Sequence, residues 1–511
     1  MKRSINIILL SIMVVALFLL PVSCTEDFLE TDPIGKATVD NFYETDKDAE
    51  MAVMAAYDIL QWKHASGSWN STYLVRELPS DDVNAGGGGE GDQPRLQRID
   101  NFNYGPENDA IATVYQTDYF GIYRANKVIN NTKPETDYRK QMIAEAKFLR
   151  AYYYFELVSM FGDVPLNLED LAPSEYSQPR APKEDIYAQI ESDLQDAISV
   201  LPLKSEYSQA DKFRATKGAA RALLGKAHLY QEEWGDAAGY FDDVITSGEY
   251  GLVDDYRSVF EVDEEFGQES LFEVSYTTKE QYNWGNFPWG ARSEEANIVI
   301  QLMGRRWDQG FNPGNTGLLG GWGFLPPTPE IYNTFTQDDQ RRDASVISED
   351  TLEAWGGGVT GDAIYEYEGY IKIKYAPKEG ETTWEGGAVG ELNYGTNLRL
   401  IRYADVLLMA AEAYYRDGNE DRARTELNKV RDRAGLADVT ASGADLFDAI
   451  VQERRRELAF EGHRFLDLIR WGLADDELSE RGFVEGKHNL YPIPLDEMRN
   501  NKEITENNPG Y

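Results

Sequence analysis

Cysteine is almost absent from this chain, which has 511 residues and a single cysteine, Cys24. One cysteine cannot form an internal disulfide, which chains of this length commonly use once they are secreted. Histidine is scarce as well, and the four residues are His64, His228, His463 and His488. No two of them have the spacing of metal ligands, so the sequence argues against a histidine-based zinc site.

Positive charge is also in short supply. Acidic residues outnumber basic ones by 89 to 50, which gives a formal net charge of -39. Such a charge repels the phosphates of nucleic acid and anionic lipid head groups. The composition therefore argues against a nucleic-acid-binding protein and favours a neutral or cationic ligand.

Only one long apolar run is present, and it lies at the start of the chain. Lys2 and Arg3 precede the run, which extends over residues 5–20 with interruptions at Asn6 and Ser11. This order is typical of a secretory signal, and the run is shorter than the roughly 20 residues of a membrane-spanning helix. The sequence therefore predicts a cleaved signal and not a permanent anchor helix.

Cys24 follows this signal directly, at the end of Val22-Ser23-Cys24. The stretch resembles the lipobox of bacterial lipoproteins, although Pro21 stands where leucine is usual. The resemblance implies that residues 1–23 are removed and that the Cys24 thiol carries a lipid, which would anchor the protein firmly. The alternative is an ordinary secreted protein with an incidental thiol.

Beyond the signal, several segments have the periodicity of helices. Residues 139–161 form an aromatic-rich helical pattern that ends in a glycine and a proline,. In residues 181–202 the apolar positions recur every three or four residues, which predicts one buried stripe. Short strands are plausible at "SLFEVSY" (270–276) and "GYIKIKY" (369–375).

Two later blocks share one spacing of small and large residues. Leu224, Gly225, His228, Ala237 and Phe241 have the same offsets as Ala410, Ala411, Tyr414, Ala423 and Leu427. The spacing matches tetratricopeptide repeats, in which small residues let two antiparallel helices pack closely and a larger side chain fills the gap. The two copies are separated by a stretch rich in glycine, asparagine and proline, so we expect the repeats to be interrupted by an insertion at about residues 251–397.

Several long motifs then resemble the SusD/RagB family. They are "DFLETDP" after Cys24, "FLRAYYYFELVSMFGDVPL", "RYADVLLMAAEAYY", "ERRRELAFEGHRFLDLIRWG" and the closing "YPIP" and "NPGY". The resemblance implies a mainly α fold, with a tetratricopeptide-like scaffold of about four helix pairs and an inserted, loop-rich capping subdomain with short strands. It implies four parts: residues 1–23 as signal, 24–250 as the first helix pairs, 251–397 as the cap, and 398–511 as the last repeats and tail.

The resemblance also implies a function. Members of the family are surface-exposed outer-membrane lipoproteins that capture oligosaccharides and act as lids on SusC-like TonB-dependent transporters, and they are not enzymes. A peptide-binding relative of the RagB type is the first alternative. A secreted glycoside hydrolase is the second alternative. Such an enzyme needs a pair of carboxylates, but among 89 acidic residues many pairs occur by chance, so sequence spacing does not support it,. In "ERRRELAFEGHR" the charges recur at helical spacing, which favours structural ion pairs.

A sugar site needs exposed rings for stacking and polar groups for the hydroxyls. Two stretches offer both, residues 62–93 and the insertion, and the family commonly draws its ligand residues from these regions on one face. The candidate ligand-binding residues are Trp69, Asn84, Tyr282, Trp284, Trp289, Trp307 and Trp322. Packing within the cap is the alternative role for each tryptophan.

The run "DDVNAGGGGEGD" (81–92) contains clustered carboxylates and glycines. No lysine follows the glycines, and the carboxylates would repel phosphate, so it is not a phosphate-binding loop. Because the run has clustered oxygen ligands, a structural calcium ion stays an alternative, although the spacing of the ligands differs from that of an EF-hand. We therefore predict no catalytic residue, no required cofactor and no other metal.

Overall fold

The structure is a computed structural model that describes residues 42–65, 69–290, 295–361 and 365–511. Cys24 and the predicted signal lie outside these residues, so the lipid attachment remains a prediction. Four antiparallel helix pairs form the scaffold, as predicted. They are α2 (Asp46–His64) with α5 (Asp109–Asn131), α6 (Asp137–Phe161) with α7 (Lys183–Val200), α8 (Lys217–Tyr230) with α9 (Trp234–Ile245), and α14 (Tyr403–Arg416) with α15 (Glu420–Arg433).

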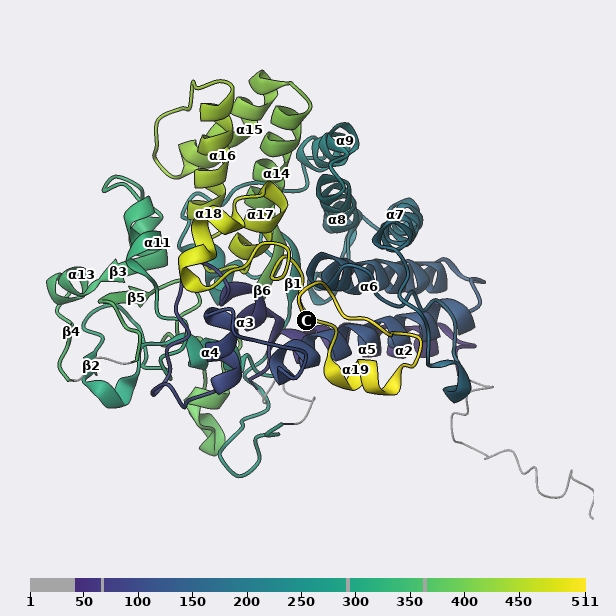
Figure 1. Ribbon diagram of the computed structural model, residues 1–511, viewed down its shortest axis with the longest axis horizontal. Helices are drawn as coiled ribbons and strands as arrows, with labels where there is room; N and C mark the ends of the chain where they lie inside the picture. Colours follow the sequence, from purple (N-terminus) through teal and green to yellow (C-terminus); the bar gives the residue numbers. More distant parts are fainter. Residues whose placement is uncertain (1–41, 66–68, 291–294, 362–364) are drawn as a thin grey trace, which may run out of the picture.

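The pairs stack in an arc. In Figure 1, α5 and α6 lie across the molecule, α7, α8 and α9 follow beside them, and α14, α15 and α16 (Ala444–Glu457) continue upward. Each pair packs on the next, through α5 on α6, α7 on α8, and α9 on α14. The mainly α, tetratricopeptide-like architecture is therefore confirmed.

Helix α6 is the centre of the scaffold because nearly all of its length is buried. Thr136 caps its first turn by accepting a hydrogen bond from the Arg139 amide, and Gly162 follows its end. The Tyr153 hydroxyl donates to the Ala56 carbonyl oxygen of α2 at 2.8 Å. Arg150 makes a bidentate ion pair with Asp193 of α7. An aromatic-rich helix thus joins its neighbours by both rings and buried charges.

The repeat spacing has the packing consequence that the sequence predicts. Gly225 of α8 lies against the ring of Phe241 of α9, so closely that a Cβ at Gly225 would lie 2.7 Å from the ring. The turns between the helices fall at the expected places, because α9 begins at Trp234 and α15 at Glu420. Both copies of the pattern are therefore helix pairs.

Between α9 and α14 the chain forms short elements only. The strand β1 (Ser270–Val274) pairs antiparallel with β6 (Leu398–Arg402), and α14 begins directly after β6. This pairing brings the two ends of the intervening segment together, which an insertion between helix pairs requires. The boundaries 251 and 397 of the cap remain a prediction.

The inserted elements lie on the left of Figure 1. Two further antiparallel strand pairs occur there, β2 (Phe311–Asn312) with β4 (Gly358–Val359) and β3 (Val346–Ser348) with β5 (Tyr370–Lys372). The predicted strands thus appear as β1 and β5. The short helices are α10 (Ile298–Met303), α11 (Pro329–Thr334), α12 (Arg342–Ser345) and α13 (Glu349–Ala354).

Five more short helices complete the described chain. They are α3 (Thr72–Glu77), α4 (Pro94–Asp100), α17 (Arg464–Trp471), α18 (Ala474–Leu478) and α19 (Leu495–Asn500). Figure 1 shows α19, near the C-terminus, beside α5. None of the helices in the described part of the chain is both long and apolar enough to cross a membrane.

Candidate functional site

Four tryptophan rings from three separate segments meet in one cluster. Trp69 precedes α3, Trp284 and Trp289 lie in the loop after β1, and Trp322 lies between β2 and α11. The ring planes of Trp284 and Trp289 differ by 5°, with centroids 6.0 Å apart, and Trp322 lies 6.5 Å from Trp284. Trp69 lies 5.3 Å from Trp322 and 6.4 Å from Trp289. We call these four residues the tryptophan platform.

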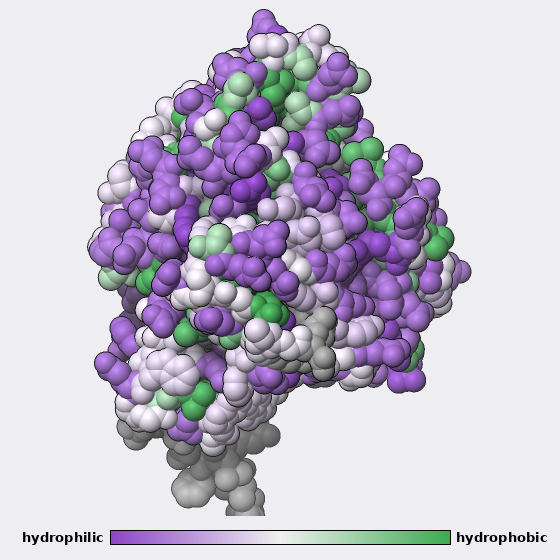
Figure 2. Space-filling view, turned by 90° about the vertical axis from the view of Figure 1, so that its left-hand side faces the viewer, coloured by the Kyte–Doolittle hydropathy of each residue, from purple (hydrophilic) through white to green (hydrophobic). Residues whose placement is uncertain are grey.

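The platform has a buried base and an exposed edge. Trp69 and Trp322 are half-buried and pack against the hydrophobic core. Trp284 is 53% exposed and Trp289 is 44% exposed. Figure 2 looks onto the side of the molecule that carries the insertion, and hydrophobic residues form only small scattered patches there. The exposure of the Trp284 and Trp289 indoles makes them available to a ligand.

A buried phenylalanine holds the loop that carries Trp284 and Trp289. Phe287 lies between them in sequence and packs with Tyr282, Ala296, Ile298 and Leu392. Its ring is 4.6 Å from that of Trp289 and 5.3 Å from that of Tyr282. Asn393 fixes the backbone of the loop, because its side chain accepts from the Tyr282 amide and donates to the Tyr282 carbonyl oxygen. The exposed rings therefore stand on a fixed support.

Trp69 is held by the residues that follow it. The Asn70 side chain donates to the Thr113 hydroxyl of α5 at 3.1 Å, and Ser71 caps α3. The backbone of Trp69 has φ 62°, which is rare for a bulky residue,. Such conformations persist where the surrounding structure fixes them, and they cluster at functional sites.

The two stretches that the sequence selects are joined by backbone pairing. The Asn84 amide donates to the Pro326 carbonyl oxygen at 3.0 Å, and the Gly87 amide donates to that of Gly323 at 2.8 Å. Gly86 lies between them with φ 67°, and a Cβ there would be 2.3 Å from the Gly323 oxygen. The glycine run thus lets residues 84–87 approach residues 323–326 closely, and the second of these segments begins directly after Trp322.

The remaining candidates do not belong to the platform. Tyr282 is buried beneath it. Trp307 is 59% exposed in the 3-10 turn η7 (Trp307–Gln309), with its backbone against Gly320. Asn84 is buried, donates to Glu368 and accepts from Arg481. Its amide is engaged within the protein, so we expect it to fix its loop.

Sequence reasoning missed Glu391, whose carboxyl group interacts with the side chain of Trp322. Burial raises the pKa of Glu391, and the interaction with Trp322 opposes the shift. Glu391 is itself only half-buried, so its carboxylate can accept hydrogen bonds from ligand hydroxyls,. No signal in "GGAVGEL" marks this glutamate among the other acids, because the residue comes to the platform only through the folding of the cap.

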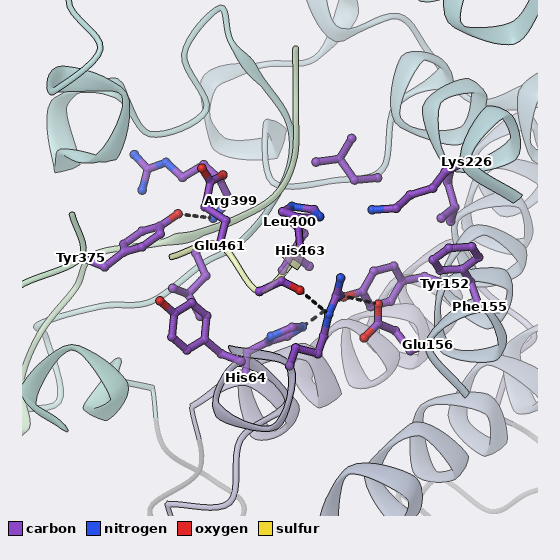
Figure 3. Close-up of a pocket in the computed structure, with 16 residues that line it drawn as sticks. His64, Tyr152, Phe155, Glu156, Lys226, Tyr375, Arg399, Leu400, Glu461 and His463 are labelled. Atoms are coloured by element: carbon purple, nitrogen blue, oxygen red, sulfur yellow. Dashed lines mark hydrogen bonds and ion pairs between the residues drawn. The ribbon is translucent and has the colours of Figure 1, made fainter. Parts of the chain in front are cut away.

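A small buried cavity lies between the scaffold and the motif that contains His463 (Figure 3). It has a volume of about 30 Å³, enough for one or two water molecules,. Burial and the neighbouring Lys63 lower the pKa of His64 to about 3, and burial lowers that of His463 far below its ordinary value. Both rings are therefore neutral, and the cavity is too small for a sugar.

The charges of this cavity are paired within the protein. Arg76 lies 3.0 Å from Glu156, and Lys63 lies 3.5 Å from the same carboxylate. Burial alone would raise the pKa of Glu156, but Arg76 and Lys63 outweigh it and bring the pKa to about 2. The arrangement is that of a structural ion-pair network.

The motif "ERRRELAFEGHR" is structural, as its spacing predicts. Glu457 of α16 contacts Arg341 of the insertion, Arg402 of β6 and Arg433 of α15. Glu453 contacts Arg341 as well, and the side chains of both glutamates are fully buried. This network joins the insertion to the scaffold.

The acidic run considered for calcium is also engaged. Asp81 pairs with Arg455 and Arg464, and Asp82 pairs with Arg455. These guanidinium groups already neutralise the two carboxylates, so the residues do not form a ready cation site.

A tighter group of possible metal ligands lies at Glu191, His228 and Glu233, within 4.8 Å of one another. His228 Nδ1 is 2.6 Å from a Glu233 oxygen, and Gln231 donates to Glu191. These hydrogen bonds join the turn between α8 and α9 to Glu191 of α7 and account for the group, so we assign no metal to it.

Two family models match the chain. Residues 268–483 match the SusD family, and residues 92–229 match the model described as starch-binding associating with outer membrane. A SusD-like protein from Formosa agariphila is 27% identical, over 97% of this chain and 98% of that protein.

Solved structures share the fold over nearly the whole described chain. A laminarin-binding SusD-like protein is 35% identical with a TM-score of 0.83, and the match covers 92% of this chain and all of that one. Surface glycan-binding protein A from Bacteroides thetaiotaomicron, solved in complex with laminarihexaose, is 26% identical with a TM-score of 0.78. That match covers 91% of this chain and 99% of the other.

Proposed function

Because this chain belongs to the SusD family, we propose that it is a cell-surface lipoprotein that binds a neutral oligosaccharide on the tryptophan platform and delivers it to a SusC-like TonB-dependent transporter. The observation that carries the proposal is the convergence of four tryptophans, with Trp284 and Trp289 exposed. The cap, residues 251–397, supplies three of the four rings, and the scaffold supplies Trp69.

The chemistry of the platform suits a sugar. Pyranose rings have flat faces of C–H groups edged by hydroxyls, and indole faces stack on such surfaces. Glu391 beside Trp322 can accept from hydroxyls,. The net charge of -39 disfavours an anionic glycan,. We therefore assign a neutral glycan as the ligand, and we assign no catalytic step to the site.

Laminarin, a neutral glucan, is the first ligand to test. One structural relative is described as binding laminarin, and another was solved with laminarihexaose. These descriptions belong to the relatives, and they supply a candidate for this chain. A panel of other neutral glycans extends the test if laminarin binds weakly.

Calorimetric titration of the Trp284→Ala and Trp289→Ala variants tests the platform. A stacked ring that acts as a hot spot contributes about 2 kcal/mol, so each variant should lose at least about tenfold in affinity. The melting temperature should change little because both rings are exposed. Trp384→Ala is the matched control, since Trp384 is 60% exposed but does not belong to the platform. Unchanged affinity in both platform variants would refute the site.

Anchoring and delivery need separate experiments. Cys24→Ala should release the protein from the outer-membrane fraction, because the lipid is proposed to be attached to this thiol. Affinity capture of the wild-type protein in mild detergent should recover a TonB-dependent barrel. Retention of the Cys24 variant in the membrane would disprove the anchor, and capture without a barrel would count against delivery. New reducing ends from incubated glycan would indicate a hydrolase instead.

A further inference from the structure

A second hollow, much larger than the buried cavity, lies on the scaffold. It has a volume of about 660 Å³ and is bounded by α5, the segment 165–176 and the chain around α19. Figure 1 shows α19 beside α5. Ligand sites for small molecules commonly have volumes of about 300–1,000 Å³, so this groove is large enough to hold several sugar units. We call it the α5 groove.

Aromatic rings line the α5 groove at helical spacing. Tyr115, Tyr119, Phe120 and Tyr123 are contributed by α5, and Tyr176 by the facing segment. Tyr123 is 53% exposed and Tyr176 is 61% exposed. Exposed tyrosines offer an apolar face and a hydroxyl together, which is the combination that recognises sugars.

The charged side chains that line the groove are acidic. Asp109, Glu169, Asp496 and Glu497 supply carboxylates, and the described lining contains no lysine or arginine. Asp109, Glu169 and Asp496 are exposed. Arg95 lies 3.8 Å from Asp109 and Arg499 lies 3.5 Å from Asp496, but the charged side chains that line the groove are all negative. The lining therefore disfavours phosphate, sulfate and uronic acid groups, whereas carboxylates accept hydrogen bonds from neutral hydroxyls. The lining therefore fits an uncharged glycan.

The groove begins beside the tryptophan platform. The Asn70 side chain, next to Trp69, donates to the Asp109 carbonyl oxygen and the Thr113 hydroxyl, and both of these residues line the groove. The lining continues along α5 to Asn126. At 1.5 Å per residue this stretch is about 25 Å long, so it leads well away from the platform.

We infer that the α5 groove binds a second stretch of the same neutral polysaccharide that the platform binds. The inference rests on the proposed function, because the platform identifies the ligand class and the groove extends its reach along the scaffold. A short oligosaccharide occupies the platform alone. A long chain engages both sites, and its affinity gains from the second contact.

The test compares laminarin with laminarihexaose on the full-length protein. The double variant Tyr123→Ala/Tyr176→Ala should weaken binding of laminarin about tenfold and leave binding of laminarihexaose within about twofold. Trp284→Ala should weaken both ligands. Tyr138→Ala is the control, since Tyr138 is an exposed tyrosine of α6 that does not line the groove.

The outcomes separate the two proposals. If Trp284→Ala loses affinity for laminarin and the double tyrosine variant does not, the groove is refuted as a glycan site and the platform is supported. Loss with the tyrosine variant alone supports the groove as a glycan site and overturns the platform. If neither variant loses affinity, or if the wild-type protein binds neither laminarin nor another neutral glycan of an array, both proposals fall.

Discussion

Gly86 is the residue that allows the two ligand-loop segments to pair. Its φ is 67°, and an added Cβ would lie 2.3 Å from the Gly323 carbonyl oxygen. We predict that Gly86→Ala lowers the free energy of unfolding by about 1–3 kcal/mol and also weakens laminarin binding, because Trp322 directly precedes Gly323. Thermal melts and titrations measure both effects.

Gly91→Ala is the control for this prediction, because no atom lies within 4 Å of a Cβ at Gly91. It should leave the melting temperature and the affinity unchanged. Equal stability of the two variants would contradict the close approach of the segments.

At the residue scale, the sequence identified which rings to consider but not how they meet. Trp284, Trp289 and Trp322 lie among glycine, asparagine and proline and outside any helical stripe, which favours exposure,. Trp284 and Trp289 are exposed, whereas Trp322 is half-buried because it packs against the core. Asn84 also lies beside glycines and outside any helical stripe, yet its side chain is buried against Glu368 and Arg481. Its partners lie hundreds of positions away in the sequence, and pairing over such a distance leaves no local pattern.

At the scale of single elements, the close packing of α8 on α9 can be tested through two glycines. A Cβ at Gly225 would lie 2.7 Å from the Phe241 ring, whereas a Cβ at Gly239 of α9 would meet nothing within 4 Å. Gly225→Ala should therefore cost about 1–3 kcal/mol. Gly239→Ala should stabilise by up to about 1 kcal/mol through helix propensity. Urea denaturation distinguishes the two, and a stable Gly225 variant would refute the packing.

Helix α16 supports a second prediction at this scale. Glu457→Ala removes a buried carboxylate that Arg341, Arg402 and Arg433 all contact, which should cost about 3–5 kcal/mol. Asp137→Ala is the control, because its pair with Lys140 is exposed and such pairs contribute about 0–1 kcal/mol,. A Glu457 variant as stable as wild type would show that the network does not hold the cap on the scaffold.

The elements themselves were largely predictable. The helices at 139–161 and 181–202 and both repeat pairs follow from periodicity and small-residue spacing, and the structure confirms them. The insertion was recognisable only by its composition. Its course depends on contacts such as the β1–β6 pairing and the Glu457–Arg341 ion pair, and these join residues that are far apart in the sequence.

For the whole molecule, buried carboxyl groups predict an optimum of stability in mildly acidic solution. Burial would raise the pKa of Asp467, but Arg454 and Arg470 outweigh it and lower the pKa to about 2. The stability that Asp467 contributes is therefore present above its unfolded pKa of about 4 and is lost as the pH falls toward 2. Burial raises the pKa of Glu265 to about 7, so its contribution is full below about pH 4 and is lost as the pH rises through 7.

The free energy of unfolding should therefore be highest near pH 5 and decline on either side. Glu265→Gln should flatten the alkaline side and stabilise the protein at pH 8 by about 1–2 kcal/mol, a value reduced from the roughly 1.4 kcal/mol per pKa unit because Glu265 is partly solvated. The exposed Asp263→Asn is the control. Urea titrations from pH 3 to 9 supply the curve, and a Glu265 variant with the wild-type pH profile would contradict the assignment.

The central claim is that a glycan stacks on the tryptophan platform, and a crystal structure with the tightest-binding neutral glycan tests it most directly. The account predicts sugar rings against the exposed faces of Trp284 and Trp289, with hydroxyls within hydrogen-bond distance of the Glu391 carboxylate. A glycan bound on another face of the molecule, with both indoles still facing solvent, would contradict it.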